Sequence, residues 1–273
     1  MDRAFGRFVH LRNKTDPPLT PWTPPPAAGL AGVKEHLSDR YGVGVKKLAP
    51  LDCGVYRVDR ADASTWVARV FPPARSLDSV EGDAALLSFL EDHDFPAERL
   101  ADSEAVSVVD GHPTLVTLFV KGKSPGGTAA VGKWQGDTLG RLHTLPLAKA
   151  PRQVGGGWHA LSLDGGGRAA DLAVLSTLLA DLRKLVPAGQ RPHVDALTRA
   201  LADIDLCEGL PRTLVHADFG GPNVLKSADG SFTVVDWAGA GRGPRAESVG
   251  AVIGPLPPAA QAAAIKAYRQ HVD

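Results

Sequence analysis

Short apolar runs alternate with polar and glycine-containing turns over the first half of the chain, a pattern typical of β-strands. Asp52-Cys53-Gly54 and Arg60–Ala63 are two such turns, and Asp110–Pro113 indicates a hairpin. Val33–Tyr41 and Val80–Glu91 favour helices instead. The expected strands are Leu48–Leu51, Val55–Val58, Trp66–Phe71, Val106–Val109 and Thr114–Val120.

Apolar residues recur every three or four positions over much of the second half, which predicts amphipathic helices. The clearest case includes Leu172, Leu175 and Leu179 and ends at Pro187. Near the end of the chain, we expect Gly241–Pro244 to form a turn and Glu247 to begin a short helix. The longer expected helices are Trp134–Leu145, Ala170–Val186, Val194–Leu206 and Ala259–Val272.

Composition narrows the class of protein. The chain has 273 residues, of which 44% are hydrophobic and 22% charged, as in a soluble globular protein. No apolar run approaches the roughly 18 residues of a membrane span, and no signal-peptide core is present, so no membrane partner is expected. The formal net charge of zero argues against nucleic acid as a partner. Cys53 and Cys207 form no metal or disulfide pattern, which favours free thiols and a cytoplasmic location. The oligomeric state stays open.

Polar side chains stand at fixed offsets between Leu214 and Trp237. Asn223 follows Asp218 by five residues, and Asp236 follows Asn223 by thirteen. A strong turn signal at 227–230 lies between apolar runs, so 224–236 is predicted to be a hairpin. Such a hairpin would bring Asn223 near Asp236, with Asp218 in the loop before it.

Phosphoryl transfer needs this set of groups. Mg²⁺ prefers oxygen ligands, which Asn223 and Asp236 would supply while the cation binds the phosphates of a nucleotide. A separate carboxylate, Asp218, would orient the acceptor hydroxyl or take its proton. The catalytic loop of protein kinases has the same spacing.

The combined motifs resemble those of the aminoglycoside phosphotransferase and choline-kinase-like family. They are His216-x-Asp218-x-x-x-x-Asn223, then Val235-Asp236-Trp237, then Gly241-Arg242-Gly243-Pro244. The resemblance implies an α+β, bilobal protein-kinase-like fold, with a small N-terminal antiparallel-sheet lobe and a larger, mainly helical C-terminal lobe. We expect a Pro-rich tail over 1–30, with Trp22 docked on the body, a nucleotide-binding lobe over 31–120, and a catalytic and acceptor-binding lobe over 121–273.

The resemblance also assigns roles outside the hairpin. Arg69 would contact the α- and β-phosphates from the third strand, the alternative being a solvent-facing arginine. Asp83 is the match for the acid that pairs with this base, and Glu81 competes with it. Gly54 lies in the turn that covers the phosphates. Backbone groups around Leu118 to Val120 would bind the adenine or guanine base. His216, in the catalytic motif, would hold the loop.

These expectations describe an enzyme that moves the γ-phosphate of ATP, or of GTP, to a hydroxyl of a small molecule such as an antibiotic, amino alcohol, sugar or amino acid. The charges between Asp164 and Glu208 are mixed in sign, which argues against a polycationic aminoglycoside. The glycine runs 155–157 and 165–167 bracket either a loop of the acceptor pocket or a linker.

A catalytically inactive nucleotide-binding or scaffold protein is the alternative. Departures from the family pattern support it: Arg69, Asp83, the glycine-poor first turn, Ala217, Glu247, and the early end of the chain after the last helix. A protein kinase is disfavoured, because Asp236 is followed by Trp237 and Ala238 instead of the Phe-Gly of the kinase metal-binding motif, and an Ala-Pro-Glu motif is lacking.

Overall fold

The computed structural model describes residues 27–61, 64–153, 167–205, 209–216 and 218–272. Three features discussed above lie outside the described residues. They are Trp22, the loop between the two glycine runs, and Ala217.

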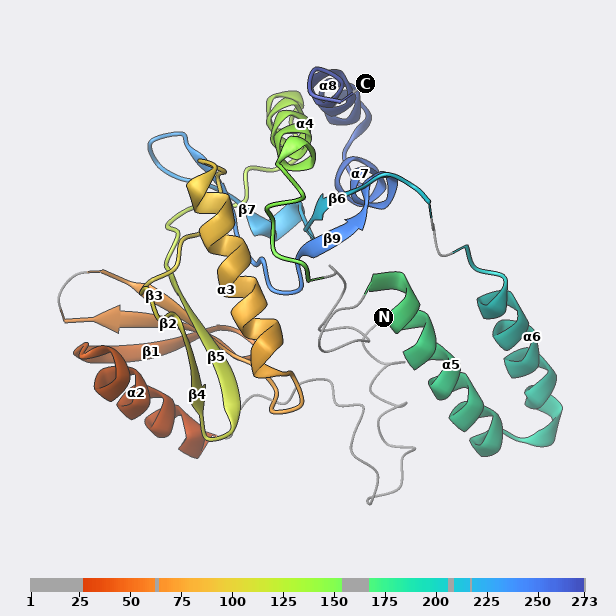
Figure 1. Ribbon diagram of the computed structural model, residues 1–273, viewed down its shortest axis with the longest axis horizontal. Coiled ribbons are helices and arrows are strands. Elements are labelled where there is room, and N and C mark those ends of the chain that lie inside the picture. Colours follow the sequence, from red (N-terminus) through yellow and green to blue (C-terminus); the bar gives the residue numbers. More distant parts are fainter. Residues whose placement is uncertain (1–26, 62–63, 154–166, 206–208, 217, 273) are drawn as a thin grey trace.

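A five-stranded antiparallel sheet forms the N-terminal lobe (Figure 1). Its strands lie in the order β1-β2-β3-β5-β4, and all five match expected strands. Asp110 and Gly111 both have positive φ, so the last hairpin turns over these two residues and β5 begins earlier than expected. The strands are β1 (Val45–Asp52), β2 (Val55–Arg60), β3 (Trp66–Val70), β4 (Val106–Val109) and β5 (His112–Leu118).

Two helices accompany this sheet. Helix α2 (Ala27–Tyr41) contacts β1 and β4, with Val33 and Leu37 buried. Helix α3 (Leu77–Asp92) begins where the Ser76 side chain accepts a hydrogen bond from the Ser79 amide, as an N-cap residue should. Helix α3 packs on β4 and β5.

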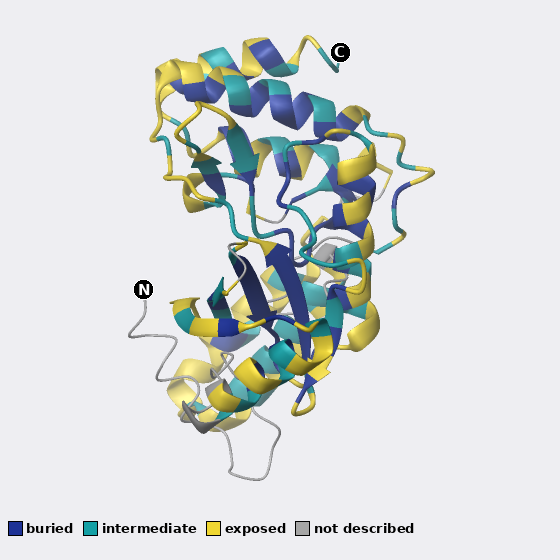
Figure 2. Ribbon diagram, turned by 90° about the vertical axis from the view of Figure 1, so that its left-hand side faces the viewer, coloured by how far each residue is buried: buried dark blue, intermediate teal, exposed yellow. Residues whose placement is uncertain are grey.

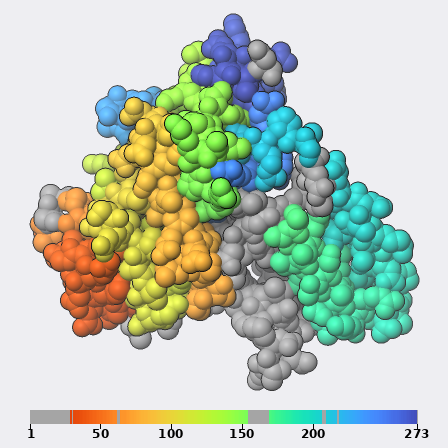
Figure 3. All heavy atoms as spheres, viewed as in Figure 1, coloured from red at the N-terminus to blue at the C-terminus, as the bar shows by residue number. Residues whose placement is uncertain are grey.

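The C-terminal lobe is mainly helical, as expected. Two short antiparallel pairs, β6 with β9 and β7 with β8, lie near the sheet lobe, and α5 and α6 pack together and project from the body (Figures 1 and 3). The helices are α4 (Ala129–Thr144), α5 (Gly167–Leu185), α6 (Arg191–Ala202), α7 (Arg245–Ile253) and α8 (Pro258–Tyr268). The strands are β6 (Arg212–Val215), β7 (Val224–Lys226), β8 (Phe232–Val234) and β9 (Gly241–Pro244).

The turn expected at Gly241–Pro244 is wrong, because these residues form β9 and pair with β6. A Cβ atom on Gly243 would lie 2.6 Å from the side chain of Val215. Glycine is therefore needed here for a close approach of two strands.

Helices α4 and α8 pack with their backbones close together. Gly132, Gly136 and Gly140 recur every fourth residue along one side of α4. Cβ atoms there would lie 2.3 Å from the carbonyl oxygen of Ala260, 2.0 Å from that of Ala264, and 2.6 Å from the His271 ring. This contact fastens the last helix to the lobe.

The two lobes share one buried core, which continues from the sheet into the C-terminal lobe (Figure 2). At the junction, the amide of Val234 donates to the carbonyl of Pro96, and the amide of Glu98 donates back to the carbonyl of Val234. No helix in the described part of the chain is long and apolar enough to cross a membrane.

Candidate active site

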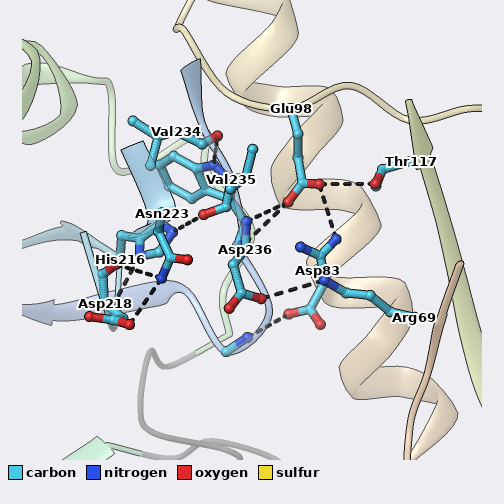
Figure 4. A network of polar contacts seen from close by, with 12 residues as sticks. Arg69, Asp83, Glu98, Thr117, His216, Asp218, Asn223, Val234, Val235 and Asp236 are labelled. Atoms are coloured by element: carbon cyan, nitrogen blue, oxygen red, sulfur yellow. Dashed lines mark hydrogen bonds and ion pairs between the residues drawn. The ribbon is translucent and has the colours of Figure 1, made fainter. Parts of the chain in front are cut away.

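His216 follows β6 and holds two backbone segments together (Figure 4). Its Nε2 donates to the carbonyl of Val235 at 3.0 Å, and its Nδ1 accepts a hydrogen bond from the Asp218 amide at 3.0 Å. Burial lowers the pKa of His216, against the opposing charge of Asp236, which favours the neutral ring that this pattern requires. His216 was expected in the catalytic motif, where it would hold the loop, and both of its ring nitrogens bond to backbone atoms.

Asn223 lies beside Asp218, directly before the β7–β8 hairpin. The amide of Val235 donates to the backbone carbonyl of Asn223, which extends the β7–β8 pairing toward Asp236. The Asn223 side-chain Nδ2 donates to the carbonyl and to Oδ2 of Asp218, at 3.1 and 2.9 Å. Asp218 itself is exposed. The predicted hairpin is thus confirmed, and the amide oxygen of Asn223 is the atom left for another ligand.

Asp236 follows β8 in a left-handed conformation, with φ of 66°. Its amide donates to Oε1 of Glu98 at 2.7 Å, and its side chain is 41% exposed. Among the described residues, no three His, Cys, Asp or Glu side chains are grouped to hold a metal ion. A hard cation that takes one carboxylate, one amide oxygen and the oxygens of a bound phosphate fits the donors that are present, because Mg²⁺ sites commonly use only one or two protein carboxylates.

Arg69 is buried in β3, which rules out the solvent-facing alternative. Its Nη1 donates to Oε2 of Glu98 at 3.0 Å, and its Nε lies 3.4 Å from Oδ1 of Asp236. Burial alone would lower the pKa of Arg69, but the charges of Glu98 and Asp236 more than reverse this, and the guanidinium stays protonated.

The expected pairing of Arg69 with Asp83 is wrong. Asp83 accepts a hydrogen bond from Nη2 of Arg75 at 2.6 Å, and Glu81, the competing acid, is exposed. Arg75 lies just before the N-terminus of α3, and its side chain reaches Asp83 within that helix. Burial raises the pKa of the Asp83 carboxyl to about 6, although the charge of Arg75 opposes this.

Asp83 nevertheless lies close to the site. Its Oδ1 accepts a hydrogen bond from the amide of Gly239 at 3.2 Å, in the loop that follows Asp236. Gln153 donates to the carbonyl of Ala240 in the same loop at 2.6 Å. The loop between Asp236 and Ala240 is therefore held by acids from the N-terminal half of the chain, Glu98 at its start and Asp83 near its end.

The remaining expected residues lie outside this network of polar contacts. Gly54 is in the β1–β2 turn with φ of 66°, and its carbonyl accepts a hydrogen bond from the Val70 amide at the end of β3. The amide of Leu118 donates to the carbonyl of Arg99. A nucleotide base that bound at Leu118 would therefore have to contact its carbonyl. Val120 is half-buried beyond the end of β5.

Two residues at the site were missed from the sequence, Glu98 and Arg75. Both are charged and buried, at 3% and 1% exposure, and charged residues are rarely buried unless paired. Neither belongs to a motif with fixed spacing. The signal that could have pointed to Glu98 is weak: an acid in the connection between the expected helix and the next strand.

One family model, described as the phosphotransferase enzyme family, matches residues 54–272 of this chain. No curated protein sequence matches this chain.

Solved structures show the same fold at low sequence identity. An amicoumacin kinase, in complex with AMP-PNP, Ca²⁺ and Ami, has a TM-score of 0.62 at 15% identity, covering 91% of this chain and 81% of that one. An aminoglycoside-3'-phosphotransferase of type VIII has a TM-score of 0.61 at 17% identity, covering 89% and 93%. Choline kinase LicA from Streptococcus pneumoniae has a TM-score of 0.54 at 15% identity, covering 89% and 80%. The expected bilobal kinase-like fold is confirmed.

Proposed function

Because this chain belongs to the phosphotransferase enzyme family, we propose that it moves the γ-phosphate of ATP, or of GTP, to a hydroxyl group of a small molecule. One observation carries the proposal. The Asn223 side chain donates a hydrogen bond to the exposed carboxylate of Asp218, and Asp236 follows the second strand of the hairpin that begins after Asn223. This arrangement supports the proposal, because phosphoryl transfer requires an acid that faces the acceptor together with oxygen ligands for the metal.

Asp218 would accept a hydrogen bond from the acceptor hydroxyl and take its proton as the acceptor oxygen bonds to the γ-phosphorus. At the same time, the bond from that phosphorus to the departing ADP or GDP would break. His216 would hold Asp218 in place through the backbone. Asn223 Oδ1 and the Asp236 carboxylate would bind Mg²⁺, which when bound neutralises charge on the phosphate oxygens. Catalysis would then rest on positioning and electrostatics, with no covalent intermediate on the protein.

Arg69 would contribute positive charge near the phosphates, and the Leu118 carbonyl and Val120 amide would contact the base. The division expected from the sequence, with a nucleotide-binding lobe over 31–120 and a catalytic lobe over 121–273, forms part of the proposal. The amicoumacin kinase complex, which holds AMP-PNP and Ca²⁺ in the same fold, supports a nucleotide with a divalent cation.

One observation favours the inactive alternative. The Nε of Arg69 lies 3.4 Å from Oδ1 of Asp236, so an ion pair already engages one oxygen of the proposed metal ligand. In an active enzyme, Asp236 would have to bind the Mg²⁺ ion while its carboxylate also pairs with Arg69.

The test measures ADP and GDP release by the full chain with Mg²⁺ and a panel of acceptors: antibiotics, amino alcohols, sugars and amino acids. Mass spectrometry of the acceptor identifies the phosphorylated product. We expect one acceptor class to gain a phosphoryl group. Mg²⁺-dependent nucleotide binding without transfer to any acceptor would favour the inactive alternative. No nucleotide binding at all would reject the proposed function and leave an inactive scaffold protein.

A further inference from the structure

Glu98 lies in the connection between α3 and β4, and its backbone is fastened to the β7–β8 hairpin. Its amide donates to the carbonyl of Val234 at 3.0 Å, and the Val234 amide donates to the carbonyl of Pro96 at 2.7 Å. Val234 ends β8, two residues before Asp236. Backbone hydrogen bonds therefore fix the position of the Glu98 main chain relative to the strand that precedes Asp236.

The carboxylate of Glu98 accepts hydrogen bonds on both oxygens (Figure 4). Oε1 accepts the Asp236 amide at 2.7 Å, and the Trp237 amide lies farther away at 3.4 Å. Oε2 accepts Nη1 of Arg69 at 3.0 Å and the Thr117 hydroxyl at 2.9 Å. One buried carboxylate thus joins β3, β5 and the residue proposed to bind the metal.

The bond to the Asp236 amide has a specific consequence for that residue. A non-glycine residue with a φ of 66° is strained, and such a conformation persists when surrounding contacts favour it. Hydrogen bonds from a backbone amide to an ionised carboxylate are stronger than those between neutral groups. Glu98 therefore stabilises the backbone conformation from which the Asp236 side chain projects, next to Arg69.

Asp83 does not supply this contact. Its carboxylate bonds to Arg75 and to the amide of Gly239, three residues farther along the loop. The acid of helix α3 and the acid beside the metal ligand are separate residues in this chain.

We propose that Glu98 is a positioning residue of this enzyme, which orients Asp236 for metal binding through the Asp236 amide and holds Arg69 beside it. The proposal rests on the proposed function, because it requires that Asp236 binds a divalent cation together with a nucleotide. It assigns to the α3–β4 connection a role in the metal site.

Calorimetric titration tests it, with a non-hydrolysable ATP or GTP analogue at a series of Mg²⁺ concentrations and without Mg²⁺. In Glu98→Gln, we expect the Mg²⁺ concentration that half-saturates nucleotide binding to rise roughly tenfold or more, as for other residues that orient metal ligands. The metal-free affinity for the nucleotide should change less. A residue with only a structural role would lower the urea midpoint of unfolding and leave the Mg²⁺ dependence unchanged, and that result overturns the proposal.

Two further variants separate an effect on Mg²⁺ binding from loss of the fold. Glu98→Asp keeps the charge opposite Arg69 but is one methylene shorter, so it should fold and still raise the Mg²⁺ requirement. Wild-type Mg²⁺ dependence in this variant would also overturn the proposal. Glu104→Gln is the matched control, because it makes the same change in the same connection at a side chain that is 69% exposed. We expect it to behave as wild type.

The wild-type titration separates the two levels of inference. If wild type shows Mg²⁺-dependent nucleotide binding and the Glu98 variants match it, the role of Glu98 falls and the proposed function stands. If wild type shows no such binding, the proposed function falls, and the role of Glu98 falls with it.

Discussion

The side-chain amide of Asn223 donates hydrogen bonds to both the backbone carbonyl and the carboxylate of Asp218. Both amide protons are directed toward one residue, so the amide oxygen is directed elsewhere. Asp218 is held in one orientation while staying exposed. In the proposed function, the amide oxygen of Asn223 would bind the cation and the carboxylate of Asp218 would face the acceptor hydroxyl.

Replacing Asp218 with Ala should remove transfer without removing nucleotide binding. Orientation or proton transfer by a positioned side chain contributes roughly 10²–10⁴ in rate, so kcat should fall by a factor in that range. Steady-state kinetics and calorimetry with the nucleotide analogue measure the two quantities. Asp203→Ala, at an exposed acid after α6, serves as the control. If transfer continues at the wild-type rate in the Asp218 variant, Asp218 is not the acceptor-facing acid.

Replacing Asp236 with Asn should weaken binding of the metal–nucleotide complex itself. Among residues with a side chain, Asn is one of the few that tolerate the left-handed conformation, so the backbone at φ of 66° is retained while the charge is lost. We expect Mg²⁺ to increase nucleotide affinity in wild type and to do so roughly tenfold less in the variant. Calorimetry with and without Mg²⁺ measures this, and an unchanged Mg²⁺ effect would exclude Asp236 as a ligand.

The parts of the site that could be read from the sequence are local. Asp218, Asn223 and Asp236 are related by a turn and a short hairpin, and fixed spacing carries that information. Glu98 bonds to Asp236, 138 residues later, and to Arg69, 29 residues earlier. Such contacts depend on how the lobes pack, and no periodic pattern encodes them.

Two errors have related physical causes. The pairing of Asp83 with Arg69 was expected because both lie at the positions that the family pattern gives to such a pair. In the structure, Asp83 pairs with Arg75, which is nearer to it in the sequence. Gly241–Pro244 was interpreted as a turn because glycines usually break strands, whereas Gly243 makes room for the Val215 side chain. In both cases the local sequence is compatible with two structures, and a tertiary contact determines which of them forms.

Acid should destabilise the fold partly through His143. Its Nδ1 and Nε2 lie 2.9 Å from the Tyr268 hydroxyl and 3.1 Å from the Ser248 hydroxyl, and burial, assisted by the charge of Arg245, lowers its pKa to about 4. The unfolded chain binds a proton near pH 6.5 and the folded chain does not, so stability falls as pH decreases between these values. From pH 7 to pH 5, this contribution is about 2 kcal/mol.

Urea unfolding of wild type and His143→Gln at both pH values checks this. The variant should lose less stability than wild type on going to pH 5, by about 2 kcal/mol. The comparison must be between variants, because burial raises the pKa of Asp83 to about 6, which changes stability in the opposite direction in this range. His193→Gln, at an exposed position on α6, should follow wild type. Equal losses in wild type and His143→Gln would show that His143 contributes nothing to the acid sensitivity.

A methyl group added at Gly136 should destabilise the C-terminal lobe. Its Cβ would lie 2.0 Å from the carbonyl oxygen of Ala264, so α4 and α8 must move apart. Overpacking of this kind costs about 1–3 kcal/mol. Gly250→Ala is the matched control, since Gly250 is also helical but exposed, with no atom within 4 Å of the added carbon. That change should stabilise the fold by roughly 0.5–1 kcal/mol through helix propensity. Opposite signs for the two substitutions in urea unfolding would show that backbone contact between α4 and α8 holds the last helix, whereas a stabilising Gly136→Ala would contradict that packing.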